Sequence, residues 1–171
     1  MVLSSMIPES SASWHNEMLP WDKNRPLTWD DFQGEIDYSD DSASAYRTLI
    51  WYESLFVEKV GSGCNYIFNQ DMHATAVFDK DVSWAKENSR DRLNLQYYQV
   101  LFNIEEVHAQ KFKNELLNNT FPCPDGVYDI DKIQEKINES FDKINAESIA
   151  MRDLFVSESN YGSNVMKHFE W

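Results

Sequence analysis

Hydrophobic residues recur every three to four positions through the middle of the chain, from about residue 90 to residue 118. This repeat predicts a single amphipathic α-helix that turns one face toward a core. Proline and glycine in residues 122–126 end the pattern. The predicted inward residues of this helix are Leu93, Tyr97, Val100, Leu101, Ile104, Val107, His108, Phe112 and Leu116.

A second helix is predicted for residues 129–155, where the hydrophobic positions again follow a helical period. Its expected inward residues are Ile130, Ile133, Ile137, Phe141, Ile144 and Met151. The remaining residues, 156–171, form a short aromatic tail that we expect to fold back on the sheet or on the long helix.

The region before the long helix has the alternating and β-branched pattern of strands, over residues 43–84. One long strand or two are expected in residues 43–59, followed by shorter strands in 64–69 and 74–78. Three to four antiparallel strands in one small sheet, followed by helices, make an α+β fold. Residues 1–42 are interpreted as an irregular aromatic arm in which Thr28 caps a short helical turn.

Composition narrows the classes of partner. A chain of 171 residues with 42% hydrophobic content predicts one domain spanning residues 1–171. Its formal charge of −14, with 29 acidic against 15 basic residues, argues against nucleic acid. No apolar run approaches the roughly 20 residues of a membrane-spanning helix, so no membrane insertion is expected.

The sequence does not decide the cellular compartment in which the protein acts. The first fourteen residues lack a basic segment followed by an apolar one, so the chain as given carries no recognisable signal peptide. The chain is either cytoplasmic or exported by a signal that has been removed. Cys64 and Cys123 are compatible with one disulfide or with two free thiols.

Several short motifs occur in a specific order. Residues 25–34 read R-P-L-T-W-D-D-F-Q-G, residues 43–46 read A-S-A-Y, and residues 74–78 read A-T-A-V-F before Ser83-Trp84. Near the end, residues 155–161 and 168–171 have the spacing of Y-x-x-E-T-x-H and Q-x-x-W. In sequence and order these motifs resemble a bacterial family of secreted zinc-dependent proteases, the domain of unknown function 922 family.

The resemblance implies a zincin-like fold and, in the family, a zinc ion held by an H-E-x-x-H motif on the long helix. Aligned to that motif, this chain has Tyr97 and Leu101 in place of the two histidines and Tyr98 in place of the glutamate. Tyr161 stands where the resemblance expects a further histidine. Zinc prefers Cys, His and carboxylate ligands, so the sequence predicts that the inherited site holds no zinc and does not catalyse.

A relocated site is the alternative. Glu105 and His108 have the Glu-x-x-His spacing of some metal proteins, and the alternative places His73, which begins a predicted strand, near them in space. The simpler interpretation places both glutamates of Glu105-Glu106 in solvent and His108 at the edge of the hydrophobic stripe. His15 and His168, close to the termini, are expected on the surface.

Three functions remain from the sequence. The favoured hypothesis is a non-catalytic relative of zinc-dependent metalloproteases, without a cofactor, that acts as a binding or structural protein. The second is an active metal-dependent hydrolase that uses His73, Glu105 and His108. The third is an unrelated module that binds a protein partner through its aromatic surface.

Overall fold

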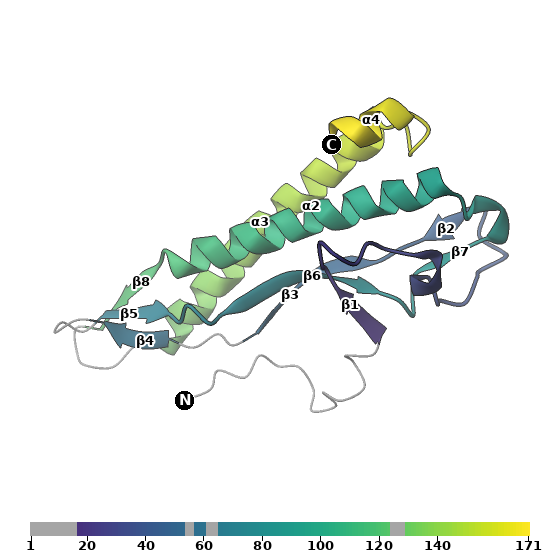
Figure 1. Cartoon of the computed structure of the whole chain (residues 1–171). Helices are drawn as coiled ribbons and strands as arrows, with labels where there is room; N and C mark the ends of the chain where they lie inside the picture. Colours follow the sequence, from purple (N-terminus) through teal and green to yellow (C-terminus); the bar gives the residue numbers. More distant parts are fainter. Residues whose placement is uncertain (1–16, 54–56, 61–64, 124–128) are drawn as a thin grey trace.

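The structure is a computed structural model that describes residues 17–53, 57–60, 65–123 and 129–171. Two long helices, α2 (Arg92–Leu117) and α3 (Ile130–Glu158), lie along one side of a series of short strands (Figure 1). A short helix, α4 (Val165–Glu170), follows α3 and contacts α2. The mixed architecture, with small antiparallel sheets and a long helix, agrees with the α+β prediction.

The described strands form three small sheets instead of the single sheet that the sequence predicts, and every pairing is antiparallel. The first sheet has the order β1-β6-β3, the second pairs β2 with β7, and the third has the order β4-β5-β8. Their bounds are β1 (Met18–Pro20), β2 (Ser44–Ala45), β3 (Thr48–Glu53), β4 (Val57–Val60), β5 (Asn65–Phe68), β6 (His73–Asp79), β7 (Trp84–Ala85) and β8 (Thr120–Pro122).

The single-sheet prediction is wrong because the segment 43–59 has three successive partners. Its first part, β2, pairs with β7, the middle part, β3, pairs with β6, and the last part, β4, pairs with β5. Hydrophobic alternation identifies strands but does not specify their partners. Strands β1 and β8 have three residues each, too few to show a period in the sequence.

Both long helices begin at an aspartate cap. The Asp91 side chain accepts hydrogen bonds from the backbone N–H groups of Leu93 and Asn94, and the Asp129 side chain accepts one from Lys132. Such caps satisfy N–H groups that have no partner within the helix. The predicted range of 90–118 agrees with α2 within two residues, whereas α3 continues three residues beyond the predicted end at 155.

Most of the predicted stripe on α2 is buried, including Leu101, Ile104, His108, Phe112 and Leu116. Leu93 and Val107 were expected to face the core, but both are exposed, and Val107 retains 51% of its accessible surface. On α3, Ile133, Ile137 and Ile144 are buried as expected, and Ile130 is exposed. These residues lie at the edge of the stripe or in a first helical turn, where a hydrophobic residue alone does not ensure a packing partner.

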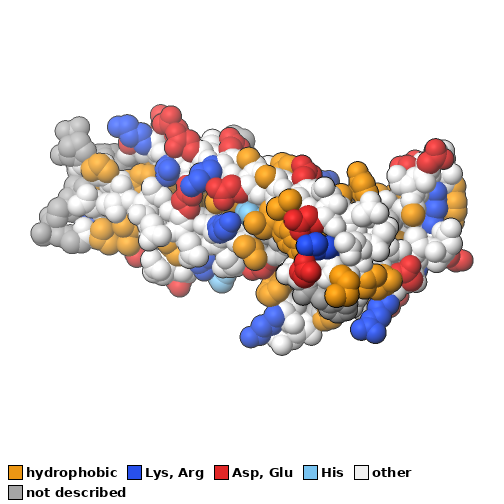
Figure 2. Space-filling model, turned by 90° about the horizontal axis from the view of Figure 1, so that it is seen from above, with side chains coloured by type: hydrophobic (Ala, Val, Ile, Leu, Met, Phe, Trp, Pro, Cys, Tyr) orange, Lys and Arg blue, Asp and Glu red, His pale blue; other side chains and the backbone are white. Residues whose placement is uncertain are grey.

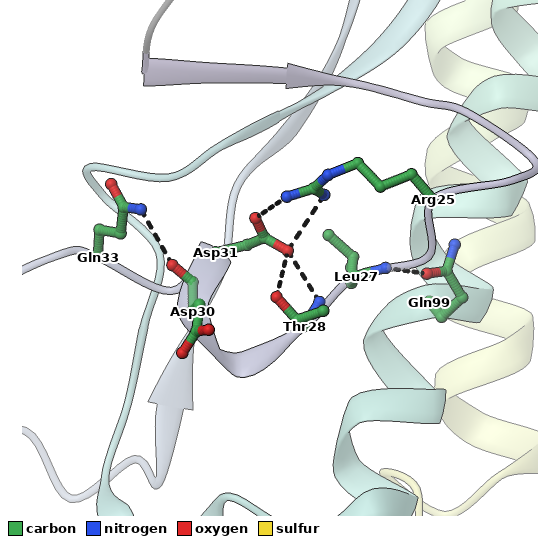
Figure 3. Close-up of polar contacts among 7 residues, drawn as sticks. All are labelled: Arg25, Leu27, Thr28, Asp30, Asp31, Gln33 and Gln99. Carbon is green, nitrogen blue, oxygen red and sulfur yellow. Dashed lines mark hydrogen bonds and ion pairs between the residues drawn. The ribbon is translucent and has the colours of Figure 1, made fainter.

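The arm is held together by a network around Asp31 (Figure 3). The backbone N–H and the hydroxyl of Thr28 donate to Asp31 Oδ2 at 2.8 and 2.9 Å, and Arg25 Nη2 lies 2.6 Å from Asp31 Oδ1. Burial disfavours the charged carboxylate, yet the hydrogen bonds from Arg25 and Thr28 outweigh it and lower the pKa of Asp31. This network stabilises the helical turn η1 (Trp29–Asp31) that the sequence predicts.

Two amide side chains of α2 bind the arm. Gln99 Oε1 accepts a hydrogen bond of 2.7 Å from the backbone N–H of Leu27, as Figure 3 shows. One turn later, Asn103 Oδ1 accepts bonds of 2.9 Å from Trp21 Nε1 and from Gln99 Nε2. The arm therefore docks on the part of α2 that the resemblance associates with the metal site.

The core consists of two separate groups of buried hydrophobic residues. The first, which we call the distal cluster, contains Ile50, Phe68, Met72, Ala74, Ala109, Phe112, Leu116, Ile133, Ile137 and Ile144. The second, which we call the proximal cluster, contains Leu27, Phe32, Ala76, Phe78, Ala85, Tyr98, Leu101, Phe102, Ile104 and Phe155. Both clusters include residues of α2, α3 and β6, so each long element runs from one cluster to the other.

Among the described residues, none of the helices has the length and hydropathy to cross a lipid bilayer. The helix side of the molecule shows acidic, basic and hydrophobic side chains next to one another (Figure 2). On this face the Lys and Arg side chains are scattered and do not form a stripe. A stripe of that kind is the electrostatic mark of a nucleic-acid interface.

Cys123 is buried and disulfide-bonded. Of the two pairing states left open by the sequence, the structure therefore excludes a free thiol at Cys123. Cys64, the other cysteine of the chain, lies outside the described residues, as does His15.

Candidate functional site

The positions that the resemblance assigns to two zinc ligands and to the catalytic glutamate are occupied by hydrophobic and aromatic side chains. Leu101 is fully buried in the proximal cluster, and Tyr98 is almost so. The Tyr97 ring stacks on Phe155 of α3, with ring centroids 5.3 Å apart. The Tyr98 hydroxyl is hydrogen-bonded to the Ser44 hydroxyl. Aromatic packing of this kind fills the space that a hydrated metal ion and a substrate would need.

These phenols are held in their neutral form. Burial raises the pKa of both Tyr97 and Tyr98, and most strongly that of Tyr97, where the neighbouring Tyr46, Tyr98 and Tyr161 raise it further. A phenol becomes a good metal ligand only as phenolate. The shifts therefore oppose metal binding by these tyrosines at neutral pH.

Tyr161 lies close to Tyr97 but does not share a cleft with Leu101. Its side chain is 78% exposed, and its backbone has a left-handed conformation with φ of 53°. The next residue, Gly162, has φ of 86° and approaches Tyr97 so closely that a Cβ atom there would lie 3.3 Å from the ring. The chain thus brings residues 161 and 162 beside Tyr97, while the side chains of Tyr161 and Leu101 lie in opposite environments.

His168 was expected on the surface, but it is buried. Its ring lies 6.2 Å from that of Tyr97 and 5.9 Å from that of Phe155, measured between ring centroids. Neither ring nitrogen has a hydrogen-bond partner within the described part of the chain. The prediction was wrong because α4 folds back onto α2 and covers a residue that lies near the end of the sequence.

A layer of polar residues lies where the long elements pass from the distal to the proximal cluster. On α2 it contains Glu105 and His108, and on α3 it contains Ser148 and Arg152. Thr48, at the start of β3, lies between the two clusters along the chain. Tyr46 before it packs on the proximal cluster, and Ile50 after it belongs to the distal cluster. We call these five residues the polar layer.

Glu105 is the central charge of the polar layer. Only 2% of its surface is exposed, and its Oε2 accepts a 2.9 Å hydrogen bond from the Ser148 hydroxyl. The same oxygen lies 3.5 Å from Arg152 Nη1. The prediction of a solvated Glu105 was wrong because α3 covers this side of α2. A buried carboxylate needs such partners, since desolvation without them is costly.

Glu106, which was also expected in solvent, makes hydrogen bonds to β6. Its Oε2 accepts hydrogen bonds from the Thr75 hydroxyl at 3.0 Å and from the backbone N–H of Ala76 at 2.8 Å, and Oε1 accepts one from Gln110. Glu106 therefore ties α2 to β6, and its role is structural. It does not face the polar layer's Ser148 and Arg152, which bind Glu105 alone.

His108 is fully buried, and the geometry determines its tautomer. Nδ1 lies 2.7 Å from the backbone carbonyl oxygen of Ile104, an atom that can only accept a hydrogen bond. Nδ1 therefore carries the proton, and Nε2 carries a lone pair. Among the described residues, Nε2 has no partner. The expectation that His108 lies at the edge of the stripe is wrong, since it sits inside the core.

The alternative metal site predicted from His73, Glu105 and His108 is not assembled. His73 is exposed at the first residue of β6, paired with Glu53 at the end of β3, whereas Glu105 and His108 are buried in the polar layer. In residues 17–53, 57–60, 65–123 and 129–171, no group of three or more His, Cys, Asp or Glu side chains is placed to hold a metal ion.

A cavity of about 310 Å³ lies beside the polar layer. It is lined by Tyr46, Arg47, Thr48, Arg152, Asp153 and Val156. Thr48 and Arg152 line the cavity and are also members of the polar layer. The cavity therefore adjoins the polar layer between the start of β3 and the second half of α3.

Ser148, Arg152, Thr48 and Tyr46 were not identified as candidates from the sequence. A signal was present on α3, because Ser148 and Arg152 interrupt the inward stripe between Ile144 and Phe155. Polar residues at inward positions often mark buried networks or sites. Thr48 and Tyr46 carried no such signal, since both residue types are ordinary in strands.

Comparison of the chain with protein-family models, with curated proteins and with solved structures finds no match.

Proposed function

We propose that this protein is a non-catalytic relative of the zinc-dependent proteases that its motifs resemble, with a zincin-like scaffold, and that it acts by binding. One observation carries the proposal: the positions aligned with the metal ligands and the catalytic base are Tyr97, Tyr98 and Leu101, which form packed core. Loss of the polar ligands removes the means of activating water. The arm and the long helix remain joined through Gln99 and Asn103.

The exposed hydrophobic residues near α4 favour binding of a protein partner. Tyr161, Met166, Leu154 and Trp171 expose between 39 and 78% of their surfaces. Tyr161 is the most exposed of the four, and its backbone has the left-handed conformation. Tyr, Trp and Met are enriched in protein interfaces, where their large side chains supply contact area.

Zinc content tests the proposal most directly. The purified full chain is incubated with excess zinc, dialysed extensively, and analysed by atomic absorption. We expect far less than one zinc ion per chain. About one tightly held zinc ion per chain, together with hydrolysis of a general protein substrate, would overturn the proposal in favour of the metal-dependent hydrolase.

A restored motif tests whether α2 ever carried the metal site. The variant Tyr97→His/Tyr98→Glu/Leu101→His supplies the family's residue types at the aligned positions. A matched control, Val107→His/Lys111→His, puts two imidazoles with the same spacing on a different side of α2, where Val107 and Lys111 are exposed. Zinc binding by the restored variant that exceeds binding by the control supports the inherited site. Equal binding indicates only the affinity of any histidine pair four residues apart.

A further inference from the structure

The cavity beside the polar layer is lined by groups that donate hydrogen bonds. Two of its six residues are arginines, Arg47 and Arg152, which come from the edge of β3 and from α3. A guanidinium group has five N–H donors and no acceptor. Both arginines line one cavity of about 310 Å³.

Few of these donors are used. Arg152 makes one ion pair, with Glu105 at 3.5 Å, and Arg47 makes one, with Asp79 at 3.7 Å. Within the described part of the chain, neither guanidinium has a contact that satisfies hydrogen-bond geometry. Arg47 is 62% exposed and Arg152 is 24% exposed, so both can reach a bound molecule.

Two hydroxyl groups add to the excess of donors. Thr48 Oγ1 is buried and has no partner among the described residues. Tyr46 lies close enough to Arg152 and Glu105 for both charges to influence its hydroxyl. A buried hydroxyl without a partner costs free energy. A ligand in the cavity removes that cost when the Thr48 side chain turns its hydroxyl toward it, because the atom is covered in the structure.

The two arginines face three carboxylates, because Glu105 and Asp79 pair with them and Asp153 also lines the cavity. The cavity therefore does not attract every anion by its net charge. Its selectivity comes from the directed donors, and the planar guanidinium fork matches the two oxygens of a carboxylate or a phosphate.

We propose that this cavity binds a small oxyanion, a carboxylate or a phosphate group, through Arg47, Arg152 and the Thr48 hydroxyl. The ligand's oxygens accept hydrogen bonds from the two guanidinium groups, and Glu105 with Ser148 holds Arg152 in place from behind. Tyr46 closes the side of the cavity that faces the proximal cluster. The inference adds a small-molecule site to the protein-binding function proposed above and does not depend on it.

Isothermal titration calorimetry with two probes tests the site. Inorganic phosphate and succinate are titrated separately into metal-free full chain at constant ionic strength set with potassium chloride. The variants are Arg152→Gln, Arg47→Gln and Thr48→Val. Arg92→Gln is the matched control, because it removes the same charge from an exposed arginine outside the cavity. Circular dichroism checks the folding of each variant.

We expect one site for at least one probe, with the preferred probe distinguishing a phosphate ligand from a carboxylate ligand. Arg47→Gln and Arg152→Gln should each weaken binding about ten-fold or more, the loss that follows removal of a charge-assisted hydrogen bond. Thr48→Val should weaken it by a smaller factor, and Arg92→Gln should leave it unchanged. If Arg152→Gln fails to fold, Arg47→Gln and Thr48→Val decide the outcome.

The proposal is overturned if the wild-type chain binds neither probe, or if Arg92→Gln weakens binding as much as Arg47→Gln does. Neither result depends on zinc or on hydrolysis. Failure of the oxyanion site therefore leaves the non-catalytic assignment intact, and a zinc-binding, hydrolytic protein would leave the titration unaffected.

Discussion

Two neighbouring parts of α2 bury side chains of different polarity. In residues 97–102 the buried side chains are hydrophobic or aromatic, and the Tyr98 hydroxyl is paired with Ser44. One turn further on, Glu105 and His108 are buried as polar groups, with an ion pair, a hydroxyl partner and one ring nitrogen without a partner. The first part is hydrophobic core. The second part buries a carboxylate and an imidazole, which hydrophobic packing does not require.

The difference in buried polarity indicates which part of α2 is the better candidate for a binding site. The resemblance directs attention to Tyr97, Tyr98 and Leu101, whose side chains pack in or against the proximal cluster. The polar layer, of which only Glu105 and His108 were considered from the sequence, is where polar groups are buried beside a cavity. Buried polar groups that cost stability are often retained for a function.

The largest effect is expected from Leu101→Ala. Removing a fully buried leucine should lower the free energy of unfolding by about 2–5 kcal/mol, since it leaves a cavity in the proximal cluster. Urea denaturation followed by circular dichroism measures the change. The control Val107→Ala, at an exposed position of the same helix, should change stability by less than about 0.5 kcal/mol. Equal losses would show that residues 97–102 are not the packed part of α2.

The next effect concerns the ion pair of the polar layer. Arg152→Met leaves the Glu105 carboxylate buried without its cation, and we expect a loss of about 1–3 kcal/mol in the free energy of unfolding. Adding Glu105→Gln should recover part of that loss, because the uncompensated charge is then gone. Denaturation of the two single variants and the double variant gives the coupling free energy. Strictly additive losses would contradict a direct interaction between Glu105 and Arg152.

His108→Leu should have a small effect of the opposite sign. Its Nε2 is buried without a partner among the described residues, so a hydrophobic side chain of similar size should raise stability or leave it within about 1 kcal/mol of wild type. Thermal denaturation measures the change in Tm. A marked loss of stability would mean that His108 contributes an interaction that the described contacts lack.

The smallest effect at neutral pH belongs to Tyr97→Phe, whose consequence appears in alkali. Burial raises the pKa of Tyr97 above its usual value of 10, so the folded chain holds this proton more tightly than the unfolded chain. The resulting stabilisation is complete below pH 10 and is lost as the pH rises toward the folded-state pKa. Urea denaturation between pH 8 and pH 11 should therefore show a shallower loss for Tyr97→Phe than for wild type. Identical slopes would exclude Tyr97 as a contributor.

Much of the fold could be predicted because its signals are local. The two long helices were placed within three residues of their observed ends, since hydrophobic spacing and caps are properties of neighbouring residues. The turn capped by Thr28 followed from the same kind of signal. By contrast, the partition into three sheets required knowledge of which distant strands pair, and alternation within one strand does not contain it.

The candidate site was predicted only in part. Glu105 and His108 were noted for their spacing, and His108 was expected on the inward stripe, but the burial of Glu105 and the role of Ser148 were not foreseen. His73 was included because its neighbours in sequence suggested a strand, and the structure places it at an exposed strand end. The cavity residues Arg47 and Arg152 are more than one hundred positions apart, and only the tertiary structure places both along one cavity.

The sequence by itself determined the order of strands and helices, the ends of the long helices and the hydrophobic or aromatic character of Tyr97, Tyr98 and Leu101. These properties depend on residue identity and on periods of a few residues. The tertiary structure alone decided which polar groups are buried, that Glu105 binds Ser148 and Arg152, and that a cavity opens beside Thr48. Those properties depend on side chains that distant segments bring into contact, because burial and pairing arise only when the elements pack.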